Sequence, residues 1–274
     1  MNNPNIGFIG AGNMATALIK GILVNGYSAQ HITACDPSEE QLKRLQDSLP
    51  EHPINTSMDS QAASNCDILV LAVKPQILPE VAKSLSKHIA KDALVVSVAA
   101  GITLDLLAKY LESRPAVRCM PNTPALLGEG ASGLFASANT SEKQKVAVEQ
   151  IFQSVGLIEW VSKESDLDSV TAVSGSGPAY FFLFMEAMIE SAVSMGLDRD
   201  AAYRLCVQTC KGAASLAEQN PDIADLRQRV TSPNGTTERA IKAFEGGGLQ
   251  ELVNTAMQDC AERSVEMANE AQNK

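Results

Sequence analysis

Short apolar runs alternate with stretches of helical periodicity through the first half of the chain. Asp67–Val73 and Ala93–Val98 are apolar runs of strand length, and helical patterns follow them around Pro79–His88 and over Thr103–Leu111. The other predicted strands are Asn5–Ile9, His31–Cys35, Ala116–Met120, Gly133–Ala136 and Gly156–Val161, and the other predicted helices are Asn13–Val24, Ser38–Leu49 and Ser141–Ser154. Apolar strands separated by helices are typical of a mainly parallel sheet covered on both faces. The pattern therefore predicts an α/β N-terminal domain.

Two of these helices begin with the spacing of a capping box, Ser38 with Gln41 and Ser141 with Gln144. In such a box the serine hydroxyl accepts a hydrogen bond from the backbone of the third helical residue, and the glutamine side chain reaches back to the serine. We therefore expect both helices to start immediately after these serines.

The pattern changes after residue 163, beyond which the sequence shows only helical periodicity. The predicted helices are Glu164–Met195, Arg199–Gln219, Ala224–Val230, Thr236–Phe244 and Leu249–Asn269. The sequence thus predicts two domains, an α/β domain over residues 1–163 and an all-α domain over residues 164–274.

Two helices of the all-α domain carry extensive apolar surface. On Pro178–Leu197 the polar positions Glu186, Glu190 and Ser194 form one narrow stripe, so we expect this helix to be buried on nearly all sides within protein rather than in a membrane. The last helix has an apolar stripe that includes small residues, which permit close approach of a partner helix. This domain has more apolar surface than its own helices can easily cover, so we expect dimerisation through it.

Composition limits the classes of partner. A net charge of −10 argues against a nucleic-acid binder, and 45% hydrophobic with 20% charged residues is ordinary for a globular enzyme. The amino terminus lacks the basic start of a signal peptide, so we expect a cytoplasmic protein. Six cysteines without a CxxC pair and three histidines outside any motif indicate reduced thiols and no metal site.

The glycines after the first predicted strand have the spacing GxGxxA, with Gly10, Gly12 and Ala15 opening a helix. Gly10 permits the tight turn, Gly12 lets a pyrophosphate approach the backbone, and Ala15 lets helix and strand pack closely. The second predicted strand leads into Asp36, where a carboxylate commonly binds the adenosine ribose hydroxyls. That charge would repel a 2′-phosphate and favours NADH over NADPH, although Asp36 could instead cap the helix that begins near Pro37.

Near the carboxyl end, the segment Val230–Thr237 reads VTSPNGTT and runs directly into a helical pattern. Asn234-Gly235 is a turn pair tolerant of positive φ, and Thr236 or Thr237 can cap the following helix. Backbone N–H groups and the helix dipole at such a start favour a small carboxylate. The alternative interpretation is an ordinary turn and N-cap.

Six segments together resemble the Δ1-pyrroline-5-carboxylate reductase family. They read GFIGAGNMA (7–15), LAVKPQ (71–76), SVAAGI (97–102), MPNTPALLGEG (120–130), AVSGSGPAY (172–180) and VTSPNGTT (230–237). The resemblance covers essentially the whole chain. It implies a Rossmann-type domain, a helical dimerisation domain, reduction of the cyclic imine to L-proline with NADPH or NADH, and dimers that can assemble further into decamers.

The resemblance also implies roles for individual residues. The positions that match the family's cofactor contacts are Gly10, Ala11, Gly12, Asn13, Met14, Ala72, Val73, Lys74, Pro75, Ala99, Ala100, Gly101 and Asn122, with Asp36 added from the reasoning above. The positions that match its substrate loop are Ser232, Asn234, Gly235, Thr236 and Thr237. Thr237 corresponds to the suspected hydrogen-bonding or proton-donating group for the ring nitrogen and is our candidate catalytic residue.

Two positions depart from the family pattern. The family usually has glycine at the position of Asn234, and it often has serine at the position of Asp36, so the substrate range and the NADPH preference are open. Two other functions are possible alternatives: a β-hydroxyacid dehydrogenase or related imine reductase, and a non-catalytic dinucleotide sensor. The absence of a lysine near Ser174–Tyr180 counts against the dehydrogenase, and a sensor would have no use for a carboxylate-binding loop.

Overall fold

A computed structural model describes residues 4–272 of the chain. They form two compact units, which we describe separately: an α/β unit of residues 4–176 together with 259–272, and a helical unit of residues 177–258. The boundary between the two compact units lies after Ser176, and the end of the last helix belongs to the α/β unit. The boundary at residue 163 remains a prediction about domains in the sequence.

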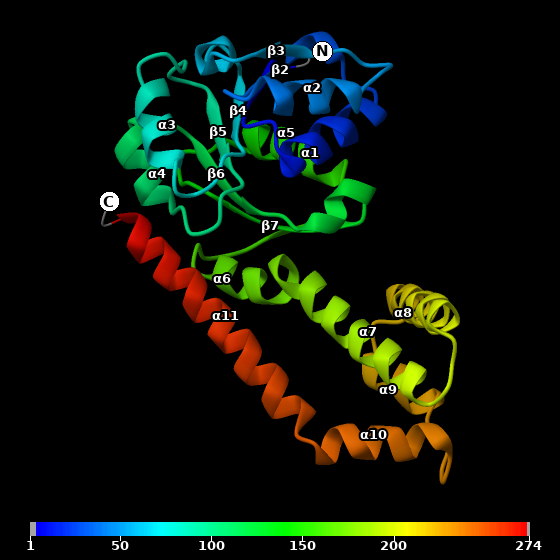
Figure 1. Cartoon of the computed structure of the whole chain (residues 1–274). Helices are drawn as coiled ribbons and strands as arrows, with labels where there is room; N and C mark the ends of the chain where they lie inside the picture. The colour runs from blue at the N-terminus through cyan, green and yellow to red at the C-terminus, as the bar shows by residue number, and fades with distance from the viewer. Residues whose placement is uncertain (1–3, 273–274) are drawn as a thin grey trace. The chain divides into compact units, whose positions relative to one another are not determined.

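The α/β unit is built on a single eight-stranded sheet (Figure 1). Its strands are β1 (Ile6–Ile9), β2 (Ile32–Cys35), β3 (Asn55–Ser57), β4 (Ile68–Leu71), β5 (Leu94–Ser97), β6 (Ala116–Met120), β7 (Gly130–Ala136) and β8 (Gly156–Trp160). They lie in the order β3-β2-β1-β4-β5-β6-β7-β8, and every pair is parallel except β6 with β7. The predicted mainly parallel sheet is confirmed.

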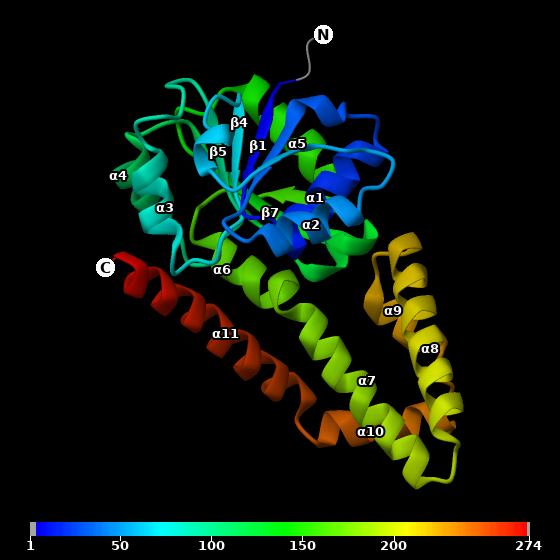
Figure 2. The ribbon, with the colours of Figure 1, turned by 45° about the horizontal axis from the view of Figure 1, so that its top comes forward.

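Helices cover both faces of this sheet (Figure 2). Helices α1 (Asn13–Val24), α2 (Glu39–Asp47) and α5 (Glu142–Gln153) pack on one face, and α3 (Leu78–Leu85) and α4 (Leu104–Leu111) pack on the other. Phe8, Leu18 and Phe152 are fully buried on the first side, and Leu71 and Leu85 are fully buried on the second. The two apolar layers hold the sheet rigid beneath the loops at its carboxyl edge.

The two predicted capping boxes differ in the structure. Ser141 and Gln144 make both hydrogen bonds of the box at the start of α5. At the start of α2 the Ser38 hydroxyl accepts from the Gln41 N–H, but the Ser38 N–H donates to Asp36 instead of to Gln41. The predicted box at Ser38 is therefore only half formed, because the preceding aspartate takes its second bond.

The sequence pattern missed one strand and merged several helical elements. The edge strand β3 has no apolar run, so periodicity could not reveal it. The predicted single helix Glu164–Met195 is divided into α6 (Asp166–Val170), a π-helical turn (Thr171–Gly175) and α7 (Gly177–Ser194). The carboxyl-terminal part of α11 (Leu249–Gln272) is held to this segment by a 2.7 Å hydrogen bond from the Ser264 hydroxyl to Asp168.

The helical unit contains α7, α8 (Arg199–Gln219), α9 (Ile223–Arg229), α10 (Thr236–Gly246) and the first turns of α11. Helix α7 packs along α8, and the Phe184 ring lies 5.8 Å from that of Phe244 in α10. The expectation that α7 is buried on nearly all sides is wrong for the single chain, where Phe182 is 64% exposed and Leu183 is 68% exposed. Within residues 4–272, no helix is both long and apolar enough to cross a membrane.

Arg114 is a buried cation that joins the ends of two helices of the α/β unit. Its guanidinium donates to the backbone carbonyls of Ser86, Ile89, Ala90 and Leu111 at 2.6–3.1 Å, at the carboxyl ends of α3 and α4. Those carbonyls have no further turn of helix to bond to, and the negative end of each helix dipole favours the cation. Arg114 therefore fastens both helices of that layer.

We predict that Arg114→Met lowers the free energy of unfolding by about 3–5 kcal/mol, because four carbonyls lose their buried donor. Urea unfolding followed by circular dichroism measures the change. The matched control is Lys83→Met on the exposed side of α3, which should change stability by less than about 0.5 kcal/mol. Equal effects of the two variants would contradict the role given to Arg114.

Candidate active site

The parallel register brings four predicted cofactor loops to one edge of the sheet. Ile9 lies opposite Leu71, Leu71 lies opposite Ser97, and Ser97 lies opposite Arg118, so β1, β4, β5 and β6 end side by side. The loops that follow them contain Gly10–Met14, Ala72–Pro75, Ala99–Gly101 and Asn122. In open α/β sheets, ligands bind at this carboxyl edge.

Gly10 fixes the turn between β1 and α1. Its φ is +102°, a conformation that costs a residue with a Cβ, and an added Cβ would lie 2.7 Å from the Ala72 carbonyl oxygen. The Gly10 N–H also donates to the Cys35 carbonyl at 2.7 Å. The glycine-rich loop is thus packed against the loop after β4, and Gly10 is required by the fold itself.

Gly12 differs, because its surroundings are open. It is the N-cap of α1 in ordinary extended backbone, and an added Cβ would meet no protein atom within 4 Å. No side chain caps this helix start, and its first turn carries no acidic residue. A helix start with uncapped N–H groups and space in front of it fits a pyrophosphate. These features match those that a dinucleotide cofactor needs at this position.

Asp36 braces the glycine-rich loop from the end of β2. Its Oδ2 accepts from the Ala11 N–H, and its Oδ1 accepts from the Ser38 N–H, both at 2.9 Å. The cap of α2 is Ser38, so the alternative in which Asp36 itself is the N-cap is not what the structure has. Asp36 lies beside the glycine-rich loop, and its own binding of the adenosine ribose hydroxyls stays a prediction.

Asn122 is buried at the end of β6, with both ends of its amide bonded to protein. The Nδ2 group donates to the Ser174 carbonyl at 3.0 Å, and the Oδ1 atom accepts from the Ala131 N–H at 2.9 Å. These bonds join the loop after β6 to β7 and to the π-helical turn. The structure thus gives Asn122 a positioning role, and its predicted contact with a nicotinamide is untested.

Glu164 and Met267, which lie outside the motifs quoted above, contact the loops at the same edge. The Glu164 carboxylate accepts from the Leu104 N–H at the start of α4 and from Arg118, both at 2.7 Å. An added Cβ on Gly101, whose φ is +72°, would lie 3.1 Å from the Met267 Cβ, so α11 packs directly on the loop after β5. Sequence reasoning missed Glu164 because a single acid outside any motif carries no local signal.

In the helical unit, the predicted substrate residues lie together where α10 begins. Asn234 has φ +58°, as expected for this turn, and the Gly235 N–H donates to the Ser232 carbonyl at 3.0 Å. The expected cap by Thr236 or Thr237 is wrong: Gly235 is the N-cap and makes no side-chain bond. Both threonines fall inside the first turn, which leaves this helix start without a hydroxyl cap.

Glu238 holds this loop in place. Its Oε2 accepts from the Asn234 N–H at 2.8 Å, and its Oε1 accepts from Lys242 at 3.0 Å. The Lys242 hydrogen bond, aided by that of the Asn234 backbone, lowers the pKa of the Glu238 carboxyl. The signal for this residue was in the sequence, because a glutamate at the third helical position often reaches back to the preceding loop.

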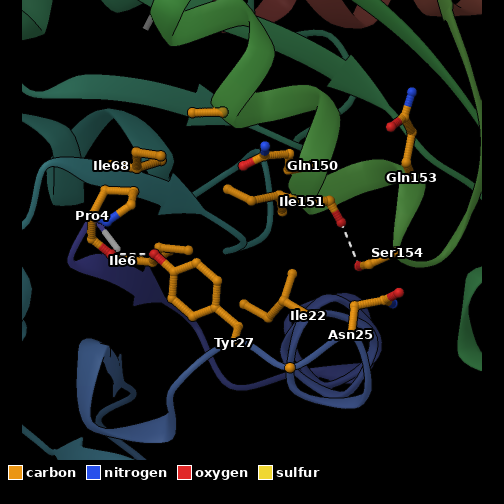
Figure 3. Close-up of a pocket in the computed structure, with 12 residues that line it drawn as sticks. Pro4, Ile6, Ile22, Asn25, Tyr27, Ile68, Gln150, Ile151, Gln153 and Ser154 are labelled. Carbon is orange, nitrogen blue, oxygen red and sulfur yellow. Dashed lines mark hydrogen bonds between the residues drawn. The ribbon is translucent and has the colours of Figure 1, made fainter. Parts of the chain in front are cut away.

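Two hollows open at the other edge of the sheet, beside the amino ends of β1 and β4. The smaller has a volume of about 400 Å³, and Ile6, Ile22 and Tyr27 are among its lining residues (Figure 3). The Tyr27 hydroxyl donates to the Pro4 carbonyl, and burial raises the pKa of Tyr27 to about 12. None of the residues predicted to bind cofactor or substrate is among those that line either hollow. The predicted cofactor residues lie instead at the carboxyl edge, so neither hollow coincides with the candidate cofactor site.

A mainly parallel sheet and an open, glycine-rich helix start at its carboxyl edge define a Rossmann-type dinucleotide-binding protein. Residues 5–101 match the family described as "NADP oxidoreductase coenzyme F420-dependent". Residues 164–267 match the family described as "Pyrroline-5-carboxylate reductase dimerisation".

Similar proteins span the full length of the chain. The pyrroline-5-carboxylate reductase of Pseudomonas aeruginosa is 45% identical over 98% of this chain and 99% of its own. Among solved structures, the pyrroline-5-carboxylate reductase of Coxiella burnetii has a TM-score of 0.91 at 40% identity, with 97% and 99% of the two chains covered. The Plasmodium falciparum enzyme, solved with NADP bound, has a TM-score of 0.86 at 30% identity, with 98% and 99% covered. The chain belongs to the pyrroline-5-carboxylate reductase family.

We predict that Gly12→Val abolishes cofactor binding while leaving the folded protein intact. The valine side chain would extend into the space in front of α1, and its Cβ would meet no protein atom within 4 Å. The free energy of unfolding should therefore change by less than about 1 kcal/mol. Isothermal titration with NADH and urea unfolding measure the two effects.

The comparison variant is Gly10→Ala, which should destabilise the protein by about 3 kcal/mol because of its positive φ and the Ala72 carbonyl. If Gly12→Val bound NADH normally, the dinucleotide would have to lie elsewhere.

Proposed function

We propose that this protein reduces the imine of Δ1-pyrroline-5-carboxylate to L-proline with NADH or NADPH, the last step of proline biosynthesis. The observation that carries the proposal is the 45% identity to the Pseudomonas aeruginosa enzyme over 98% of the chain, which includes both the glycine-rich loop and the loop before α10. The net charge of −10 and the free cysteines suit a cytoplasmic enzyme.

The cofactor is assigned to the carboxyl edge of the sheet in the α/β unit. Gly12 and the first N–H groups of α1, at Asn13 and Met14, would hold the pyrophosphate. The nicotinamide end of the cofactor would lie against the loops Ala72–Pro75 and Ala99–Gly101. Asn122 would hold the neighbouring loop after β6 in position through its hydrogen bonds to Ser174 and Ala131. When bound, the reduced nicotinamide supplies a hydride.

The substrate carboxylate is assigned to Ser232–Thr237 at the start of α10. The first N–H groups of a helix lack partners within the helix. At the start of α10 no side chain caps them, although the Gly235 N–H donates to the Ser232 carbonyl. A carboxylate fits this position because both the N–H groups and the dipole favour negative charge. Anchoring the acid group would fix the orientation of the ring.

Little acid–base machinery is needed for this reaction. A protonated imine carbon is already strongly electrophilic, and a nearby cation would disfavour the protonated form. A neutral hydroxyl can donate to or accept from the ring nitrogen without adding charge. We assign this task to Thr237, which lies half-buried in the first turn of α10.

The active protein is proposed to be a homodimer that pairs through the helical unit, with decamers as a further level of assembly. The apolar residues that this unit leaves exposed include Phe181, Phe182, Leu183, Leu205 and Leu252. Patches of this kind mark protein interfaces. The family match over residues 164–267 carries dimerisation in its description.

We predict that Thr237→Ala lowers kcat by roughly 100-fold or more, because the ring nitrogen loses its hydroxyl partner. The dissociation constant of NADH should stay unchanged, and Thr237→Ser should keep most of the activity. Steady-state assays with pyrroline-5-carboxylate, read by the absorbance of the reduced cofactor, give kcat and KM. Equal losses of turnover and of NADH affinity would remove Thr237 from the chemistry, and wild-type protein inactive with both cofactors would reject the reaction.

We predict that Phe182→Glu converts the dimer to a monomer, because a charge would enter an apolar interface. Sedimentation velocity measures the assembly state. Val24→Glu is the matched control, since Val24 is 83% exposed on α1 of the α/β unit and should leave the dimer intact. A Phe182→Glu protein that remains dimeric would place the interface elsewhere.

A further inference from the structure

Two helices begin at the carboxyl edge of the sheet near the glycine-rich loop, and their starts differ in charge. Helix α1 has an uncapped start and no acid in its first turn. Helix α2 is capped by Ser38 and begins with Glu39 and Glu40. Only the first of these starts is suited to receive a phosphate, because carboxylates beside N–H groups repel a second anion.

Two of the backbone donors that precede and open α2 are already occupied. The Ser38 N–H donates to Asp36, and the Gln41 N–H donates to the Ser38 hydroxyl. Asp36 is held in this position by its second bond, from the Ala11 N–H of the glycine-rich loop. An anion placed at the end of β2 would therefore meet the Asp36 carboxylate, and neither the Ser38 nor the Gln41 N–H would be available to it.

Among the residues that the structure describes, neither Lys43 nor Arg44, the two cations of α2, forms an ion pair with Asp36 or Glu39. Arg44 forms an ion pair with Glu40 at 2.5 Å, one turn along the same helix. Lys43 is exposed to solvent. A further acid, Asp59, lies just after the neighbouring strand β3. The end of β2 is also joined to β3 by a 3.2 Å bond from the Asp36 N–H to the Ser57 carbonyl. Around the end of β2 the acids Asp36, Glu39, Glu40 and Asp59 outnumber the basic side chains.

In a Rossmann-type domain the adenosine ribose lies at the end of the second strand, where an acid favours free ribose hydroxyls and a base accommodates a 2′-phosphate. We infer that this protein selects NADH over NADPH, and that Asp36, with Glu39 in support, is the residue that excludes the 2′-phosphate. The inference rests on the proposed function for the location of the cofactor. It assigns Asp36 two tasks, since the same carboxylate also positions the loop through Ala11.

The test is isothermal titration of the purified full-length protein with NADH and with NADPH, without substrate. NADH should bind at least about tenfold more tightly than NADPH. A carboxylate about 5 Å from the 2′-phosphate would raise the free energy of NADPH binding by electrostatic repulsion. Asp36→Asn keeps the size of the side chain and an oxygen that can accept from the Ala11 N–H. It should tighten NADPH binding several-fold and weaken NADH binding, because the ribose hydroxyls would lose a charged acceptor.

The matched control is Asp47→Asn, which removes the same charge from the exposed carboxyl end of α2 and should leave the ratio of the two dissociation constants unchanged. Glu39→Gln is a second variant, at a residue outside the glycine-rich loop. Like Asp36→Asn, it should lower the dissociation constant of NADPH relative to that of NADH. This variant decides the matter if Asp36→Asn binds neither cofactor.

Wild-type protein that binds NADPH as tightly as NADH would overturn the inference. A wild-type preference for NADH that neither Asp36→Asn nor Glu39→Gln reduces would overturn the assignment to these residues. Turnover assays with pyrroline-5-carboxylate separate this inference from the proposed reaction. Activity that is highest with NADPH defeats only the preference, whereas tight NADH binding without turnover of the imine defeats only the reaction.

Discussion

Ile9 of β1 lies opposite both Cys35 of β2 and Leu71 of β4, and this parallel register is the constraint on which the cofactor site depends. Because the strands run in the same direction, each leaves the sheet at the same edge, and loops far apart in the sequence become neighbours. The contact between Gly10 and the Ala72 carbonyl exists only in this register. A slip of one residue would turn every buried side chain of a strand to the opposite face, so the two apolar layers on the sheet also fix the geometry of the loops. The pairing of the strands thus determines both the stability of the α/β unit and the positions of the loops that are proposed to bind the cofactor.

The helical unit is built on a different principle. Few of its residues are buried within the chain: Ala202 and Cys206 are the apolar ones in α8, and α10 has none. A unit of this size needs a closed apolar core to offset the entropy of ordering its helices. The proposed dimer would provide that core, so folding of this unit would depend on protein concentration. The loop before α10 belongs to this unit, which means that the proposed substrate site would be fully ordered only in the assembled protein.

Much of the fold could be predicted because each signal was local. The apolar runs of β4 and β5, the helix Arg199–Gln219 and the positive φ of Asn234 followed from periodicity and turn chemistry. What could not be predicted depends on contacts between distant residues. Edge strand β3 has no apolar pattern, the π-helical turn at Thr171–Gly175 has no sequence signature, and the Ser38 box fails because Asp36 competes for the Ser38 N–H. For the candidate cofactor residues, parallel strands made it predictable that their loops meet at the carboxyl edge of the sheet. The hydrogen bonds of Asn122 and Glu164 could not be predicted.

An acidic protein that binds two anionic ligands must do so through local donors. A net charge of −10 opposes both a dinucleotide and a carboxylate at long range, but salt screens this repulsion beyond about 8 Å. Backbone N–H groups at a helix start act within that distance, because they donate directly to the ligand. At α10 this requires that the first-turn carboxylate of Glu238 be kept from competing with the ligand. One of its oxygens accepts from Lys242 and the other from the Asn234 N–H, so its charge is compensated while it shapes the turn. The same pair reduces the repulsion between this glutamate and the occupant of the proposed carboxylate site.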